Sequence, residues 1–242
     1  MATQLSGSVQ VAAQGLYTSS ADQNHNLGDT VRSNDGRTFR YCKAGGSSLI
    51  SAELQQAKAE NTSDQNLAVA AAAIGDTTVT TTTTVTVDAN EYANGFMVVA
   101  VTPGLGKIYK IKSHPAASGA VVTLTLSDPI EVALTSVSRV DLVANPYDSV
   151  IQQPTSRTSA TLGVAVHPIT NAQFGWLGVN GPQPVLADSA GLTVGLHFTS
   201  SDATAGATEV ITDGNTELLP PIGRALSGVA AGEVGVGFLN LG

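Results

Sequence analysis

Short runs of β-branched residues between closely spaced turn signals limit the fold of this chain more than its length or charge does. Eight of the ten residues at positions 77–86 are Thr and the other two are Val, a density that favours extended backbone. Val122, Leu124 and Leu126 alternate with threonines, as expected of a strand with one buried face. Turn signals recur about every 8–15 residues, a spacing that predicts an antiparallel sandwich or barrel rather than βαβ units.

Two β modules are predicted, one on each side of a proline-containing segment. Residues 67–150 form the first module, residues 151–242 form the second, and residues 145–154 are interpreted as the linker between them. In the second module, groups of large apolar residues each occupy one strand face, with mostly Gly or small and polar residues opposite. These groups are Val164/Val166, Phe174/Trp176, Val194/Leu196/Phe198 and Val234/Val236/Phe238.

The N-terminal residues predict an arm followed by a β-hairpin. Residues 1–27 are polar with few apolar anchors, so we interpret them as an extended arm that another subunit holds in place. The hairpin turns at residues 34–36, Asn-Asp-Gly, because this sequence tolerates positive φ. Phe39 and Tyr41 then share one face of the second strand.

One short helix is predicted after the hairpin, over residues 47–59. Ile50, Leu54 and Ala57 recur there at helical spacing, and the helix completes a hairpin-plus-helix segment at residues 28–66. The predicted fold class is therefore mainly β, with two antiparallel β-sandwich or β-barrel modules, an extended N-terminal arm and one short helix.

Composition excludes several classes of function. Only 12% of the residues are charged and the formal net charge is −8, so a nucleic-acid partner is not expected. The single cysteine, Cys42, excludes an internal disulfide and a multi-cysteine zinc site. No apolar run approaches the ~20 residues that span a bilayer, and no signal peptide is visible, so no membrane partner is expected. With so few charges, the surface is either Thr- and Ser-rich or buried in an assembly.

No local pattern of catalytic or ligand-binding residues stands out. The four histidines have no histidine partner two or four positions away, and the two Gly-x-Gly pairs open no predicted helix. Neither a nucleophile elbow nor a zincin motif is present, so we expect no enzyme activity, no cofactor and no metal. Carboxylates that are distant in sequence could still pair for catalysis, and this alternative stays open.

Several stretches resemble virion proteins of tailed bacteriophages that are encoded near the major capsid protein. The N-terminal and middle stretches are DTVRSNDGRTFRYCKAG (29–45), NEYANGFMVV (90–99), YKIK (109–112) and LSDPI (126–130). The C-terminal stretches, FGWLGVNGPQPVL (174–186), IGRAL (222–226) and GEVGVGFLNL (232–241), are similar to the small β-barrels of head-decoration proteins. The resemblance implies a capsid decoration (cement) protein, made in the host cytoplasm, that binds the major capsid protein on the exterior of the virion as a homotrimer.

The residues expected to contact a partner come from three segments. They are Val9 and Tyr17 in the arm, Phe39 and Tyr41 in the hairpin, and Thr80, Thr82 and Thr84 on the outward side of the Thr-rich strand. Ordinary core packing is an equal alternative for Phe39 and Tyr41. Other functions also stay open: a tail, head-fibre or adhesion module that binds host glycans around Trp176, or a β-rich enzyme or bacterial surface protein.

Overall fold

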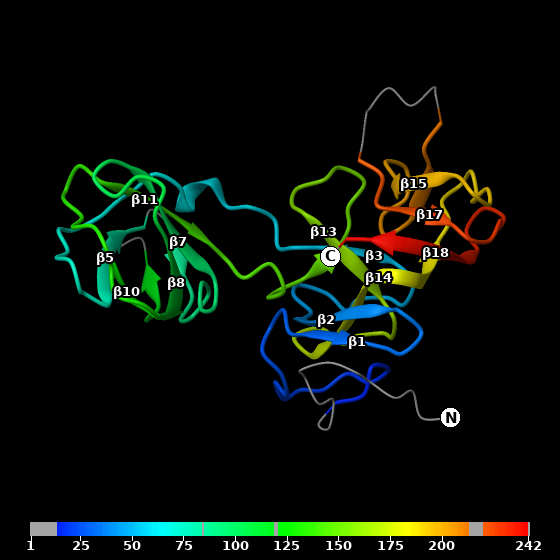
Figure 1. The fold of residues 1–242 in the computed structure, drawn as a ribbon, viewed down its shortest axis with the longest axis horizontal. Coiled ribbons are helices and arrows are strands. Elements are labelled where there is room, and N and C mark those ends of the chain that lie inside the picture. The colour runs from blue at the N-terminus through cyan, green and yellow to red at the C-terminus, as the bar shows by residue number, and fades with distance from the viewer. Residues whose placement is uncertain (1–13, 84, 119–120, 213–219, 242) are drawn as a thin grey trace. The chain divides into compact units, whose positions relative to one another are not determined.

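A computed structural model describes residues 14–83, 85–118, 121–212 and 220–241 (Figure 1). Strands hold 44% of the residues, and the helical structure in the described ranges is one 3₁₀ turn, η1 (Thr62–Asp64). The chain divides into two compact units, and each is built around its own sheet. The prediction of a mainly β fold with two modules is confirmed.

Unit 1 comprises residues 1–59 and 146–242 and contains a curled, ten-stranded sheet. Its strands are β1 (Thr30–Arg32), β2 (Thr38–Lys43), β3 (Leu54–Gln56), β12 (Ile151–Gln152), β13 (Thr161–Ala165), β14 (Phe174–Leu186), β15 (His197–Ser200), β16 (Thr208–Val210), β17 (Gly223–Ala225) and β18 (Val234–Asn240). The main path runs β12-β3-β13-β14-β18-β17-β15-β16, while β2 pairs with β14 and β1 pairs with β2.

The long strand β14 organises this sheet because its two halves have different partners. The first half pairs with β2 and with β13, whereas the second half pairs with β18. Pro182 and Pro184 lie in the second half, opposite Phe238 and Val236. Proline has no backbone N–H and cannot donate a hydrogen bond to a neighbouring strand. At these two positions β14 therefore pairs with β18 without a donor of its own.

Two glycines of β18 make room for side chains of neighbouring segments in unit 1. Phe198 on β15 is fully buried beside Val185 and Leu239. A Cβ atom on Gly237 would lie 2.6 Å from Cζ of Phe198, and one on Gly235 would lie 3.1 Å from a methyl group of Val229. The Gly-x-Gly pair at residues 235–237 is therefore a packing feature of the sheet.

Unit 2 comprises residues 60–145 and forms a nearly closed barrel. Its main strands are β4 (Leu67–Ala68), β5 (Thr78–Thr82), β7 (Phe96–Val101), β8 (Ile108–Ser113), β10 (Val121–Leu126) and β11 (Arg139–Val143), and β6 (Thr86–Val87) pairs separately with β9 (Ala117–Ser118). The six strands follow the order β4-β11-β7-β8-β10-β5. A bridge between Val69 and Thr81 brings the two ends of this order together. The predicted alternation on β10 is confirmed, and β8 shows the same alternation of burial.

The predicted helix over residues 47–59 is wrong. This segment contains a turn, with Ala52 at φ 67°, followed by β3, which lies between β12 and β13. All three residues of β3 are buried, including Gln55 and Gln56. Because β3 pairs with a strand on each side, these tertiary contacts override the helical spacing of its apolar residues.

The predicted boundaries also change. Residues 28–66 are not a separate segment, because β1, β2 and β3 join the sheet of the C-terminal half. The expected linker at 145–154 contains β12, which pairs with β3. Unit 2 is therefore inserted between two parts of unit 1, and its bounds, 60–145, are close to those of the predicted first module.

Candidate protein interface

Phe39 and Tyr41 lie in the core of unit 1, so they do not form a contact surface. Residues 14–27 of the predicted arm cover them. The Tyr41 hydroxyl donates to Oε1 of Gln14 at 2.6 Å, and the backbone N–H of Asn24 donates to the Tyr41 oxygen. The described part of the arm therefore packs on its own chain, and core packing is confirmed for both aromatic residues.

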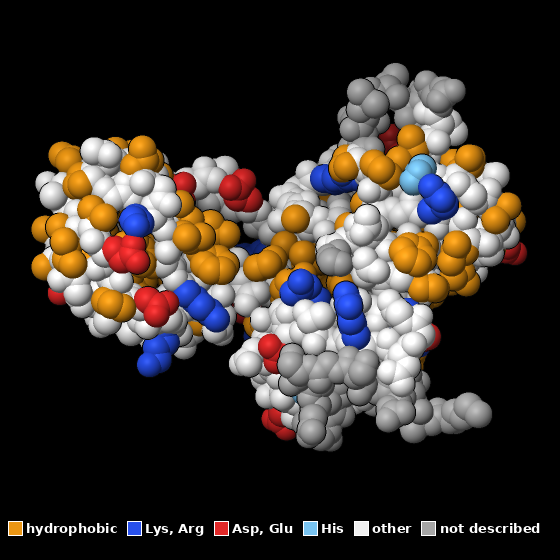
Figure 2. Space-filling model, in the orientation of Figure 1, with side chains coloured by type: hydrophobic (Ala, Val, Ile, Leu, Met, Phe, Trp, Pro, Cys, Tyr) orange, Lys and Arg blue, Asp and Glu red, His pale blue; other side chains and the backbone are white. Residues whose placement is uncertain are grey.

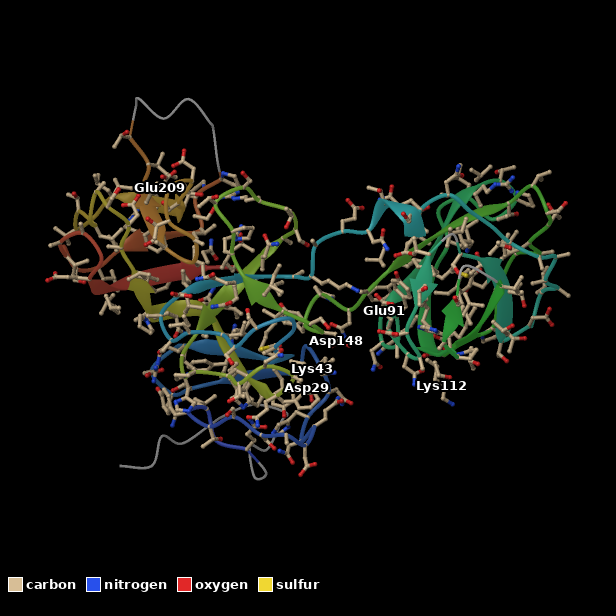
Figure 3. All side chains as sticks on the ribbon, turned by 180° about the vertical axis from the view of Figure 1, so that it is seen from behind. Asp29, Lys43, Glu91, Lys112, Asp148 and Glu209 are labelled. Atoms are coloured by element: carbon tan, nitrogen blue, oxygen red, sulfur yellow. The ribbon has the colours of Figure 1, made fainter. Side chains whose placement is uncertain are left out.

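Further hydrogen bonds hold the arm, and the residues that follow it, against β14 and the hairpin. Ser20 exchanges two backbone hydrogen bonds with Phe174 at the start of β14. Asp29 (Figure 3) accepts from the backbone N–H of Asn26 through its carboxylate and from the N–H of Tyr41 through its carbonyl. These bonds hold residues 14–27 over the cluster that contains Phe39, Tyr41 and Trp176. The sequence pattern of residues 14–27 does not indicate this packing.

Three of the predicted contact residues lie on the surface. Tyr17 is 50% exposed, and its hydroxyl accepts a hydrogen bond from Nη1 of Arg37 at 3.0 Å. Thr80 is half-buried and Thr82 is exposed on β5, as predicted for the outward side of this strand. Tyr17 belongs to unit 1 and the two threonines belong to unit 2. Val9 and Thr84 lie outside the described residues.

Trp176 is also buried and cannot serve as a platform for a sugar ring. Its ring lies 5.0 Å from that of Tyr41 and 5.1 Å from that of His25, measured between centroids. Cys42, on the other side of β2, is fully buried as well, and desolvation raises the pKa of its thiol. Both residues therefore act in packing.

A row of apolar side chains covers the outward face of the sheet in unit 1. Val234, Val236 and Phe238 project from β18 and are 54%, 43% and 45% exposed. We call the surface formed by these residues and their same-face neighbours the apolar sheet face; its members are Pro182, Pro184 and Leu186 on β14, Val234, Val236 and Phe238 on β18, and Leu226 after β17. Figure 2 shows hydrophobic side chains gathered where β17 and β18 lie.

The sequence of β18 produces this face through an inverted pattern. Its inward positions include Gly235 and Gly237, which make room for side chains from neighbouring segments, whereas its outward positions carry large apolar residues. The apolar residues of a half-buried strand ordinarily face the core. The alternation Val-Gly-Val-Gly-Phe is the sequence signal for this surface, because glycine at two inward positions leaves residues 235 and 237 with no side chain to place in the core.

One cation lies within the apolar sheet face. Arg224 on β17 is opposite Phe238 on one side and opposite His197 on the other. Nη2 of Arg224 lies 3.4 Å from Nε2 of His197. In the described part of the chain no carboxylate forms an ion pair with Arg224. The face thus offers apolar area together with a guanidinium group that can bind an incoming carboxylate.

Carboxylates lie elsewhere in unit 1, and they form no metal site in the described ranges. Glu209 on β16 (Figure 3) has a raised pKa because it is partly desolvated and because Asp202 is nearby. Glu53 also has a raised pKa, chiefly through burial, although the amide of Gln152 donates to its Oε2 at 2.7 Å. These two groups are held by structural contacts and are not gathered around a common centre.

Comparison with known proteins adds no relative: no family model, no curated protein and no solved structure matches this chain. Across the residues that the structure describes, no helix is long and apolar enough to span a membrane.

Proposed function

We propose that this chain is a capsid decoration (cement) protein of a tailed bacteriophage, a structural protein rather than an enzyme. It binds the major capsid protein on the outer surface of the head and stabilises the joints between capsomers. The observation that carries this proposal is the apolar sheet face. Soluble monomers rarely expose contiguous apolar patches larger than a few hundred Å², and such patches commonly mark protein–protein contacts.

The scarcity of charge supports an assembly role for a second reason. Each ionised side chain that enters an interface without a partner opposes association through its desolvation cost. Charged residues are 12% of this chain, about half the ~25% of an average globular domain. Several of its surfaces can therefore be buried at once at low electrostatic cost, as a protein that joins neighbouring capsomers requires.

The alternative of a glycan-binding adhesion module receives less support. Its expected platform, Trp176, is packed against Tyr41 in the core of unit 1. Phe238 is an exposed aromatic residue, but it lies among aliphatic side chains and beside Arg224 on the apolar sheet face. That environment favours a protein partner over a sugar.

The outward side of β5 is a second surface that we propose for contact with the capsid. Thr80 and Thr82 lie there next to β10, and Thr80 Oγ1 is 3.2 Å from Oγ1 of Thr123. Uncharged hydroxyl groups can exchange hydrogen bonds with a neighbouring protein without the desolvation cost of a charge. This surface belongs to unit 2 and the apolar sheet face belongs to unit 1, so each unit offers one surface for contact with a capsomer.

Binding to phage heads tests the proposed function. Heads that lack this protein are mixed with the purified chain, and bound protein is measured after sedimentation and located by electron microscopy. We expect saturable binding at the symmetry axes of the head and release of DNA at a higher temperature. Saturable binding to tails or to host glycans, with none to heads, would contradict the proposal.

A double substitution, Thr80→Asp with Thr82→Asp, tests the contact surface. It should weaken head binding by about tenfold or more, because unpaired carboxylates oppose burial. Thr135→Asp, at an exposed position in a turn of the same unit, is the matched control and should leave binding unchanged. Equal effects of the two changes would show that the outward side of β5 is not the contact.

A further inference from the structure

Two lysines stand apart from the other charged residues of unit 2. Lys110 and Lys112 are exposed two positions apart on β8, on the outward side of the barrel, as Figure 3 shows for Lys112. Neither forms an ion pair in the described part of unit 2, which includes all of its charged residues. The other two basic residues of the unit have partners, because Lys107 pairs with Glu131 and Arg139 donates to two backbone carbonyl groups.

The carboxylates of the neighbouring segments are also engaged. Asp141 on β11 accepts from the backbone N–H of Asn66 at 2.7 Å, and Glu91 accepts from the N–H of Asp88 at 3.0 Å. The chain as a whole has a formal net charge of −8, so two adjacent cations without an acidic partner are a local exception. A partner that covers them must supply carboxylates of its own, because a desolvated and unpaired charge opposes association.

Exposed apolar side chains surround the lysine pair. Phe96 on β7 is opposite Lys110, Val143 on β11 is opposite Phe96, and Ile108 precedes Lys110 on the outward side of β8. Phe96, Ile108 and Val143 are 36%, 59% and 47% exposed. We call these three residues, together with Lys110 and Lys112, the cationic barrel face. Its composition fits a partner that combines acidic and apolar side chains.

The spacing along β8 restricts the form of that partner. Side chains two positions apart on a strand lie about 7 Å apart on the same face. An extended segment that runs over β8 has the same repeat, so carboxylates at two alternate positions can each face one lysine. The next alternate position of such a segment then lies over Ile108, where an apolar side chain fits.

A nucleic-acid strand matches this face less well. A DNA strand carries a phosphate about every 3.4 Å, so its charge would continue past the two lysines over apolar and hydroxyl side chains. The only charges that face it there would be two cations in a unit whose other basic residues are already bonded. The limited number of cations and the apolar residues beside them therefore favour a polypeptide.

The cationic barrel face lies close to the outward side of β5. Strand β10 is between β8 and β5 in the sheet. Thr125 on β10 is opposite Ser113 at the end of β8 and opposite Thr78 on β5. The hydroxyl groups of β5 and the cations of β8 can therefore contact the same partner.

We infer that the cationic barrel face binds an extended acidic segment of a partner protein. Two carboxylates at alternate positions of this segment face Lys110 and Lys112, and an apolar residue at the next alternate position covers Ile108. The inference rests on the proposed function, in which the partner is the major capsid protein, and it names the chemistry of the capsid segment that this surface contacts.

Binding to phage heads that lack this protein tests the role of the lysines. Lys110→Gln with Lys112→Gln should weaken binding of the full-length chain by about tenfold. Raising NaCl to roughly 0.5 M should weaken binding of the wild type more than binding of this variant, because salt screens the charges that the variant has lost. Arg32→Gln with Lys58→Gln removes the same charge from exposed positions of unit 1 and is the matched control, which should bind like the wild type. Circular dichroism and thermal unfolding confirm that both variants are folded.

A synthetic peptide tests the chemistry of the ligand without a capsid. The probe is Ser-Glu-Ser-Glu-Ser-Leu-Ser, blocked at both ends, and the comparison peptide has Gln in place of Glu. In NMR titrations of the full-length chain, the probe should shift the signals of Phe96, Ile108, Lys110 and Lys112, and the comparison peptide should bind about tenfold more weakly. A single-stranded oligothymidylate should bind more weakly than the probe.

The two experiments separate this inference from the proposed function. Peptide binding at the cationic barrel face without binding to heads would support the acidic ligand and contradict the capsid role alone. Head binding that is unchanged in the Lys110→Gln, Lys112→Gln variant would overturn the inference alone. Peptide-induced shifts elsewhere on the chain, equal binding of the two peptides, or tighter binding of the oligothymidylate would also overturn it.

Discussion

Strands β10 and β18 show the same alternation of burial with opposite chemistry. On β10 the buried positions are apolar and the outward ones are mostly threonine, whereas on β18 two buried positions are glycine and three outward positions are Val, Val and Phe. Both patterns have a period of two. The period identifies a strand, but the neighbouring side chains decide which face is core, as Phe198 does when it fills the space over Gly237.

The largest expected effect comes from truncation of a buried residue on β10. Leu124 is fully buried in the barrel, so Leu124→Ala should lower the free energy of unfolding of unit 2 by about 2–5 kcal/mol. Val236→Ala on β18 should change the free energy of unfolding of unit 1 by less than about 1 kcal/mol, because the side chain is half-exposed. Hydrogen exchange of the strand amides measures the stability of the two units separately. If the two variants lose comparable stability, the outward face of β18 is part of the core.

An added methyl group on β18 should have the next largest effect. Gly237→Ala places a Cβ atom against the ring of Phe198, which is itself fully buried, and should destabilise unit 1 by about 1–3 kcal/mol. Phe198→Leu in the same chain should relieve part of this strain, so the two changes should couple favourably in a double-mutant cycle measured by denaturant unfolding. If the two changes in the free energy of unfolding simply add, Phe198 is not the reason that residue 237 must be glycine.

The sequence-based predictions succeeded where neighbouring residues determine the structure. The hairpin turns at Gly36, and Val31 pairs with Phe39 across it, as its turn residues predict. The outward position of Thr82 on β5 likewise follows from local alternation.

Predictions failed where distant segments determine the environment. Residues 54–56 became a strand because β12 and β13 flank them, and both arrive about a hundred residues later in the chain. For Phe39 and Tyr41 the sequence left a partner surface and core packing as equal alternatives, and the structure covers both with residues 14–27, a polar segment that bonds to Tyr41 through Gln14. The apolar sheet face was overlooked for the same reason, because Phe198 lies on a different strand from Gly237, which makes room for it.

The smallest effects on stability should come from exchanging the outward chemistry of the two strands. Val236→Thr and Thr123→Val both replace an outward residue by one of nearly the same shape, so each should change the free energy of unfolding by less than about 0.5 kcal/mol. Their effects on association should differ. Val236→Thr introduces a hydroxyl at the centre of the apolar sheet face and should weaken the binding of a protein partner to that face, while Thr123→Val, on the other unit, should leave this binding unchanged. Sedimentation with phage heads over a range of concentrations measures this difference. If the two substitutions change association equally, the outward apolar residues of β18 have no specific role in association.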